Sequence, residues 1–124
     1  MATITIYLRS LKGTENRLYM RDTKGNEAIN DLETVVEKGG GSTVTWELEK
    51  NSGIKGISRI WVRDDKPEGK VFKYEPKKQL LKKVHQVDLV KSDIELREKY
   101  YIKYIIDDGT EMIIDPFIRI PPPR

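Results

Sequence analysis

Residues 100–120 decide the fold, and they read Tyr-Tyr-Ile-Lys-Tyr-Ile-Ile-Asp-Asp-Gly-Thr-Glu-Met-Ile-Ile-Asp-Pro-Phe-Ile-Arg-Ile. Two apolar runs flank Asp107-Asp108-Gly109, and an Asp-Gly pair between alternating runs is the strongest short-range signal for a β-hairpin. Alternate residues of the first run share one strand face: Tyr100, Ile102, Tyr104 and Ile106. Pro116 cannot donate a hydrogen bond to a strand ladder, so it predicts a bend or a bulge in the second run. We therefore predict a last hairpin that closes a β-sandwich, with the earlier strands packed around it.

Short runs with strand character recur through the rest of the chain, separated by turns rich in Gly, Pro, Asp and Asn. The runs that predict strands are residues 3–9, 17–21, 34–36, 44–50, 57–63, 71–74 and 83–90. A helix competes only over residues 79–88, where Leu80, Leu81 and Val84 also fit helical spacing. The pattern predicts an all-β protein, a single antiparallel Greek-key β-sandwich over residues 1–120, followed by a proline-rich tail at residues 121–124.

Composition bounds the classes of function. The chain has 124 residues, enough for one domain with its own core. It contains no cysteine, which excludes disulfides, thiolate nucleophiles and cysteine metal sites. Its 23 basic and 20 acidic residues give a formal charge of +3, a mixed surface rather than a polycation. The sequence shows neither a signal peptide nor an apolar run of membrane-spanning length, so we expect a soluble cytoplasmic protein.

Two segments resemble known β-sandwich families. Residues 36–46, Val-Glu-Lys-Gly-Gly-Gly-Ser-Thr-Val-Thr-Trp, resemble the V-x-x-G-x-x-V-x-W segment of cupredoxin-like domains, in which a glycine turn leads into a strand with a buried aromatic residue. The hairpin at 100–120 is similar to the last two strands of that Greek-key sandwich, and to the closing strands of an immunoglobulin-like domain. Cupredoxins hold copper with two His and one Cys, commonly with an axial Met, whereas this chain offers Met112, one His and no Cys. The resemblance implies the fold without its copper, so we expect no cofactor.

Isolated titratable residues are the only candidates for chemistry at a site. His85 could act as a general base or a pH switch, but no second His and no Ser or Cys nucleophile motif accompanies it. A solitary ring on a half-buried strand accounts for it more simply. The acidic pairs Asp64-Asp65 and Asp107-Asp108, with Asp115, could line a cation site, but they lack the spacing of a calcium loop and fit turn chemistry. We expect no metal site and a protein that is not an enzyme.

A lysine cluster could bind a polyanion. Its members are Lys66, Lys70, Lys73, Lys77, Lys78, Lys82 and Lys83. Phe72 and Tyr74 interleave with these lysines, a pattern typical of single-stranded nucleic-acid binding. The cluster contains no Arg, and lysines also keep exposed edge strands from pairing with other chains. A solvated edge therefore competes with the nucleic-acid interpretation.

The two tryptophans separate the core from a candidate surface. Trp46 alternates with Val44 and Leu48, which predicts a buried ring, whereas Trp61 has the opposite parity from its apolar neighbours. Its indole either is exposed or packs against a second layer. Exposed aromatic residues anchor protein interfaces and also stack on sugars, and three more could extend such a surface: Tyr7, Tyr19 and Tyr101. We predict a non-catalytic module that presents this surface, or a sheet edge, to a protein partner, with nucleic-acid and carbohydrate binding as alternatives.

We expect residues 39–42, Gly-Gly-Gly-Ser, to form a flexible joint, because glycine-rich segments behave as flexible coils.

Overall fold

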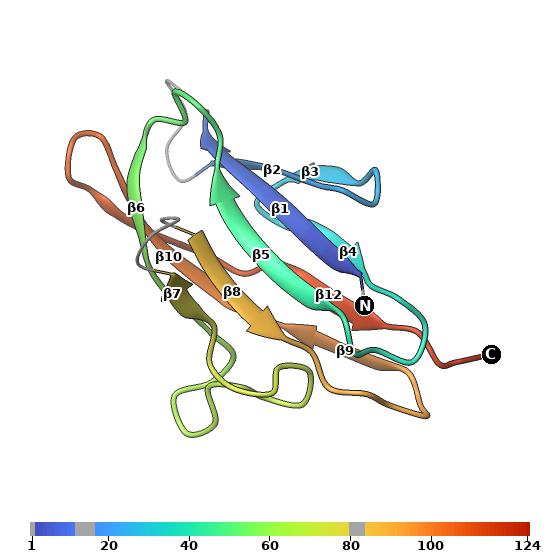
Figure 1. The fold of residues 1–124 in the computed structure, drawn as a ribbon. Helices are drawn as coiled ribbons and strands as arrows, with labels where there is room; N and C mark the ends of the chain where they lie inside the picture. The colour runs from blue at the N-terminus through green and yellow to red at the C-terminus, as the bar shows by residue number, and fades with distance from the viewer. Residues whose placement is uncertain (1, 12–16, 80–83) are drawn as a thin grey trace.

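The computed structural model of the protein describes residues 2–11, 17–79 and 84–124. Within these ranges the chain is all-β, with twelve strands and no helix (Figure 1). The strands are β1 (Thr3–Ser10), β2 (Leu18–Asp22), β3 (Glu27–Ile29), β4 (Glu33–Val35), β5 (Thr43–Leu48), β6 (Ile54–Trp61), β7 (Lys77–Gln79), β8 (Val84–Asp88), β9 (Leu96–Lys99), β10 (Tyr101–Ile106), β11 (Glu111–Ile114) and β12 (Phe117–Ile120). They form two layers, a six-stranded sheet and a second layer built from two three-stranded sheets. The all-β prediction is confirmed.

β1 organises the six-stranded sheet, whose order is β3-β2-β1-β5-β8-β7. Its apolar residues alternate, so Ile4, Ile6 and Leu8 are buried and the residues between them face outward. β1 pairs antiparallel with β2 but parallel with β5, and β4 pairs parallel with β12 in the other layer. The prediction of a purely antiparallel sandwich was wrong. The long connection through β2, β3 and β4 returns the chain to the end at which β1 begins, so β5 runs in the same direction as β1.

The hairpin at 100–120 forms the centre of the second layer. β9 continues through Tyr100 into β10, and β11 continues through Asp115 and Pro116 into β12. β10 pairs with β11 and β6, whereas β12 pairs with β9 and β4. One long hairpin therefore contributes two strands to each three-stranded sheet, β10 and β11 to one and β9 and β12 to the other. Its two arms are joined between the sheets where the Tyr100 N–H donates to the Pro116 carbonyl at 3.0 Å. The break falls at Pro116, as predicted.

The hairpin turn uses the residues that its geometry requires. The Gly109 N–H donates to the Ile106 carbonyl at 2.9 Å, and the Ile106 N–H donates to the Thr110 carbonyl at 3.0 Å. Gly109 has a φ of 91°, the left-handed conformation found at the end of three-residue hairpin loops. Asp108 accepts a hydrogen bond from the Thr110 N–H at 2.8 Å, and hydrogen bonding from the Thr110 side chain, together with this backbone bond, lowers the pKa of the Asp108 carboxyl group. The predicted hairpin is confirmed, and turn chemistry accounts for Asp108.

Three aromatic residues join the layers at the centre of the core. Trp46 of β5, Tyr100 of the hairpin and Phe72 of the connection between β6 and β7 are all fully buried. Their ring centres lie 5.5–5.8 Å apart with edge-to-face geometry. The Trp46 Nε1–H donates to the Tyr100 hydroxyl at 3.1 Å, and burial raises the pKa of Tyr100, which therefore stays neutral. The prediction of a buried Trp46 is confirmed.

Two local predictions were wrong. Residues 71–74 form turns rather than a strand, and Phe72 makes only an isolated bridge to Leu89, because its ring is needed in the core. The segment 39–42 is not a free joint. Gly39 donates to the Pro121 carbonyl at 2.8 Å and Gly41 donates to the Val90 carbonyl at 3.2 Å, so three successive glycines with positive φ hold a fixed backbone path.

The choice between helix and strand near residue 84 resolves in favour of the strand. Residues 84–88 form β8, whereas Leu80 and Leu81, which supported the helical alternative, lie outside the described residues. The proline-rich segment at 121–124 leaves the body beyond β12 (Figure 1), although the Pro121 carbonyl still accepts the hydrogen bond from Gly39.

Candidate functional site

Trp61 and Tyr101 lie side by side on the outer face of the β6-β10-β11 sheet. β6 ends with Trp61, β10 begins with Tyr101, and the two residues are register partners. Their neighbours Ile60 and Ile102 are buried, so the alternation turns both aromatic rings away from the core. The ring centres lie 5.4 Å apart with planes tilted by 33°. Both side chains are half-buried, which settles the sequence alternatives for Trp61 in favour of partial exposure.

Ile113 of β11 completes this surface. It lies beside Lys103 in the register, and 47% of its surface is exposed, the second most exposed large apolar residue among those described. A shallow hollow of about 360 Å³ is lined by Trp61, Val62, Arg63, Asp64, Tyr101 and Ile113. We call Trp61, Tyr101 and Ile113 the aromatic patch. It combines large apolar side chains with an open depression, the arrangement that accepts a side chain from another molecule.

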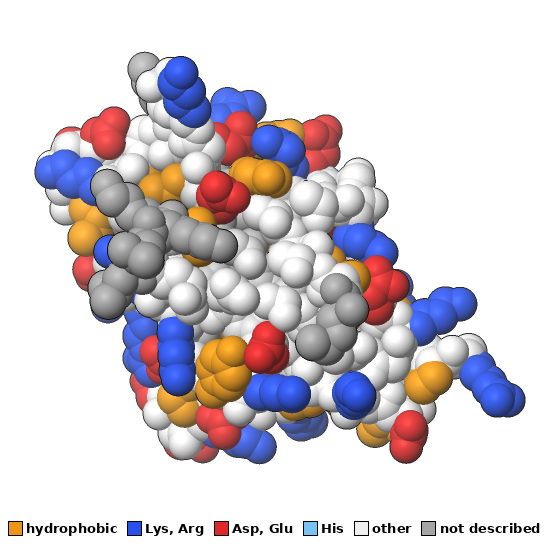
Figure 2. All heavy atoms as spheres, in the orientation of Figure 1, with side chains coloured by type: hydrophobic (Ala, Val, Ile, Leu, Met, Phe, Trp, Pro, Cys, Tyr) orange, Lys and Arg blue, Asp and Glu red, His pale blue; other side chains and the backbone are white. Residues whose placement is uncertain are grey.

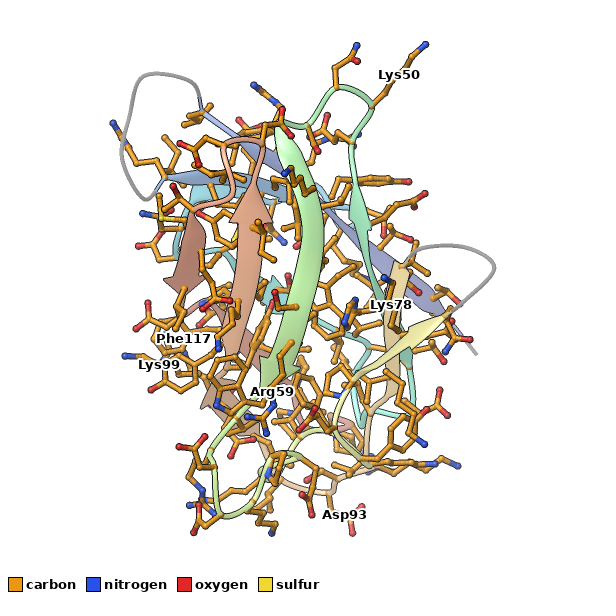
Figure 3. The ribbon with its side chains drawn as sticks, turned by 90° about the vertical axis from the view of Figure 1, so that its left-hand side faces the viewer. Lys50, Arg59, Lys78, Asp93, Lys99 and Phe117 are labelled. Atoms are coloured by element: carbon orange, nitrogen blue, oxygen red, sulfur yellow. The ribbon has the colours of Figure 1, made fainter. Side chains whose placement is uncertain are left out.

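Arg59 borders the aromatic patch and is held in place. Its guanidinium carbon lies 4.8 Å from the Trp61 ring centre, within the range of a cation–π contact. Its Nη2 donates to Glu75 at 2.8 Å, and this hydrogen bond raises the pKa of Arg59. Figure 3 shows Arg59 on β6, the edge strand of its sheet. A fixed cation beside an indole loses little side-chain freedom on binding, which favours its use in recognition.

The cations further along this layer are engaged with acidic neighbours. Phe117 of β12 lies beneath Arg97 and Lys99, whose charged groups are 4.0 Å and 5.5 Å from its ring centre. Figure 3 shows Lys99 next to Phe117. Arg97 pairs with Glu33, Lys99 pairs with Asp115, Lys103 pairs with Glu111, and Arg119 pairs with Glu95. The layer therefore presents both signs of charge around the aromatic patch.

Tyr7 and Tyr19 do not join the aromatic patch. They lie on β1 and β2, in the other layer, where each ring faces an arginine of the neighbouring strand. The Arg21 guanidinium lies 4.2 Å from the Tyr7 ring centre, and Arg9 lies 4.5 Å from that of Tyr19. The Tyr19 hydroxyl donates to Glu27, which raises the pKa of the tyrosine. Of the four aromatic residues proposed from the sequence, the structure brings together only Trp61 and Tyr101.

Only one of the two aromatic residues expected among the lysines of the cluster lies near them. Lys70 and Lys73 lie on the connection after β6, Lys77 and Lys78 lie on β7, and Lys82 and Lys83 fall outside the described residues. Phe72, expected between these lysines as a stacking surface, is in the core. Tyr74 is half-buried, with Lys77 over its ring and its hydroxyl donating to Asp88 at 3.3 Å. The described lysines are exposed, and only Lys77 and Lys78 lie on a sheet edge, β7, where Tyr74 is the ring beside Lys77.

His85 lies inside the molecule. It is register partner to Trp46 and only 5% exposed. Burial lowers the pKa of its imidazole, and the charge of Lys78 acts in the same direction while Glu75 opposes it. Within residues 2–11, 17–79 and 84–124, no group of three or more His, Asp and Glu residues lies close enough to hold a metal ion.

Sequence reasoning missed Arg59 and Ile113 as members of the surface. Ile113 carried a signal, because it has the outward parity between Met112 and Ile114 on the second hairpin run. Arg59 shares the parity of Trp61 two residues away, but nothing local shows that Glu75 holds it.

Sequence comparison assigns no family. No protein-family model matches the chain, and no curated protein matches its sequence. In the described part of the chain, no helix could span a membrane.

Proposed function

We propose that the chain is a non-catalytic interaction module that binds a protein partner through the aromatic patch. The observation that supports this role is the half-exposed Trp61–Tyr101 pair beside exposed Ile113, over a hollow of about 360 Å³. Tyr, Trp and Arg are enriched among the residues that contribute most to binding energy at protein interfaces. Arg59, which is already fixed by Glu75, supplies the third of these types at the border of the patch.

The surrounding charges give this surface a means of selecting its partner. Asp64 and Asp65 expose 92% and 81% of their side chains, and the ion pairs Lys99–Asp115 and Lys103–Glu111 lie on the same layer. Charges at the rim of an interface contribute more to specificity and association rate than to affinity. The aromatic patch would supply the affinity, and the mixed rim would reject partners with mismatched charge.

Side-chain docking fits β6 better than strand addition does. β6 is the edge strand of its sheet, and edge-strand pairing was the other route expected from the sequence. Its pairing with β10 shifts register at two places, between Lys103 and Tyr104 and between Ile105 and Ile106. Such bulges bend an edge strand and hinder the pairing of a further strand.

We also infer that the two-layered fold is a Greek-key sandwich of the cupredoxin-like or immunoglobulin-like type. The glycine turn before β5, the buried Trp46 on that strand and the closing hairpin support this inference. Fold class by itself assigns no activity, so the proposed role depends on the aromatic patch.

The experiment is an affinity capture from source lysate, with and without nuclease, followed by direct binding of each recovered protein to purified variants. Trp61→Ala should abolish the binding of a true partner. Tyr7→Ala is the matched control, because it removes an aromatic ring of similar exposure from the other layer. Full binding by a folded Trp61→Ala variant would refute the proposed surface. Loss of all recovery after nuclease treatment would instead support the lysine cluster.

A further inference from the structure

The outer face of the six-stranded sheet has a different chemistry from the rest of the surface. The chain is 35% charged, yet the centre of this face is a broad zone with few charged side chains, which gather at its rim (Figure 2). β1, β5 and β8 run beneath this zone in the same view (Figure 1). We call these outward residues the hydroxyl face: Thr3, Thr5, Thr43, Thr45, Glu47 and Gln86. Asp88 lies opposite Thr43 at the end of this face and accepts a hydrogen bond from the Thr43 hydroxyl at 2.8 Å.

The strand registers set these side chains in rows. Thr3 lies opposite Thr43, and Thr5 lies opposite Thr45, across the parallel pair of β1 and β5. Gln86 of β8 lies opposite Thr45 on the other side. Neighbouring strands are about 4.8 Å apart and alternate residues about 6.7 Å apart, so polar groups repeat at the scale of one sugar ring. A hollow of about 560 Å³ is lined by Thr3, Thr45, Glu47, Val84 and Gln86.

Glu47 distinguishes this hollow from an ordinary solvated strand face. Threonine is favoured on exposed strands for its shape, so hydroxyl groups alone indicate no ligand. Within the described part of the chain, however, the Glu47 carboxylate has neither a hydrogen bond nor an ion pair. Glu49, two residues along the same face, is approached by both Arg9 and Arg21 at 3.8 Å and 3.6 Å. Tyr7 is the register partner of Glu47, and its ring lies against the guanidinium of Arg21.

We propose that the hydroxyl face is a binding site for a neutral linear oligosaccharide. Sugar hydroxyls both donate and accept, and Thr, Gln and Glu side chains offer the matching acceptors and donors. A carboxylate makes the strongest of these bonds, because a hydrogen bond to an ionised acceptor is about twice as strong as a neutral one. Among the residues that the structure describes, those that line the hollow include no Lys or Arg, and the one charged group among them is the carboxylate of Glu47, which disfavours a phosphate or sulfate ligand. A flat face across three strands suits a chain of sugars better than a single ring.

The test is an amide-resolved NMR titration of the full chain with cellohexaose, xylohexaose, laminarihexaose and mannohexaose, each added separately. At least one should shift amide signals at residues 43–47 and 84–86 in a saturable manner. The absence of saturable shifts with all four sugars overturns the proposal. Shifts confined to Trp61 and Tyr101 also overturn it, because they place the sugar on the other layer.

Variants separate this site from the aromatic patch. Glu47→Gln keeps the shape and a neutral acceptor, and it should weaken sugar binding by about three- to tenfold, because a hydrogen bond to an ionised acceptor is about twice as strong as one to a neutral acceptor. Thr45→Val removes one hydroxyl without changing the side-chain shape and should weaken binding by a smaller factor. Glu111→Gln is the matched control, because it neutralises a carboxylate on the outer face of the other layer. Unchanged affinity in a folded Glu47→Gln variant, or loss of binding in Trp61→Ala, refutes the proposal.

Discussion

The outer faces of the two layers follow the same strand alternation but present opposite chemistries. The six-stranded sheet shows threonines, a glutamine and the Glu47 carboxylate, which has no ion pair among the described residues, around a hollow. The second layer shows the aromatic patch, surrounded by paired charges. Alternation alone decides that a residue faces outward, but the neighbouring strands decide what surface that residue helps to form.

Tyr7 and Trp61 illustrate this difference. Both are half-exposed aromatic residues on the outward parity of a strand. Tyr7 meets Arg21 on one neighbouring strand and Glu47 on the other, so it sits in a polar environment. Trp61 meets Tyr101 across the register, so two apolar rings combine into one surface. The same residue class therefore contributes to surfaces of different chemistry on the two faces.

Removal of the shared core should disrupt both faces together. Trp46→Ala deletes the ring that contacts Phe72 and Tyr100, and we expect a loss of about 3–5 kcal/mol in the free energy of unfolding, as for other buried aromatic residues. Urea denaturation followed by circular dichroism measures this loss. Trp61→Ala is the control and should cost less than about 1.5 kcal/mol, because its ring is partly solvated. Equal losses in the two variants would show that the faces do not depend on a common core.

A smaller loss in the free energy of unfolding is expected from a substitution in segment 39–42, which is hydrogen-bonded to Val90 and Pro121. A Cβ at Gly40, where φ is 80°, would lie 2.1 Å from the Val90 carbonyl oxygen, so Gly40→Ala requires backbone movement. We expect it to lower the free energy of unfolding by roughly 2–4 kcal/mol. Gly109→Ala meets open space at a φ of 91° and should cost only about 1–2 kcal/mol of conformational strain. A thermal or urea melt that reverses this order would contradict the account of segment 39–42.

The pH dependence of stability should show the protonation of His85, which lies beneath the hydroxyl face. Burial lowers its folded-state pKa, so the unfolded chain binds more protons in the window between the folded pKa and about 6.5. The free energy of unfolding should therefore fall as the pH drops below about 6.5 and recover as it rises. In His85→Leu this component should disappear, and the difference between wild type and variant isolates it from carboxylate titration. If the free energies of unfolding of wild type and His85→Leu change in parallel between about pH 5 and 7.5, the lowered pKa assigned to His85 is contradicted.

Tryptophan fluorescence tests the difference between the two layers directly and relies on the smallest expected change in stability. Each layer contributes one tryptophan, and only Trp61 is accessible. In Trp46→Phe the remaining emission should be quenched by acrylamide, whereas in Trp61→Phe the remaining emission should be blue-shifted and protected. Protection of the emission of Trp46→Phe from acrylamide would show that Trp61 is buried and would remove the basis of the aromatic patch. Circular dichroism of each variant confirms that the fold is retained.

Local sequence signals predicted much of the fold because they act over short distances. The Asp-Gly turn, the alternation around Ile102 and the break at Pro116 each depend on residues within one hairpin. The strand proposed at 71–74 failed because Phe72 is drawn into contact with Trp46 and Tyr100, a demand that its neighbours in sequence do not show. The expected flexibility of segment 39–42 failed for the same reason, since Val90 and Pro121 hold it from far along the chain.

The candidate sites likewise combine features that the local sequence shows with features that depend on distant strands. Sequence reasoning selected Trp61 and Tyr101 as candidate surface residues and left open whether Trp61 is exposed, and it grouped them with Tyr7 and Tyr19, which lie on the other layer. It passed over the threonines of β1 and β5, because each strand alone shows only ordinary outward hydroxyls.

By itself the sequence determined the longer strands, the side of each of them that is buried and the absence of cysteine chemistry, because these properties follow from composition and a two-residue period. The tertiary structure decided that Tyr101 lies beside Trp61 and that Thr5 lies beside Thr45. Both pairs are forty residues apart, and their register is set by burial of the whole core, since a one-residue slip would turn every side chain to the other face.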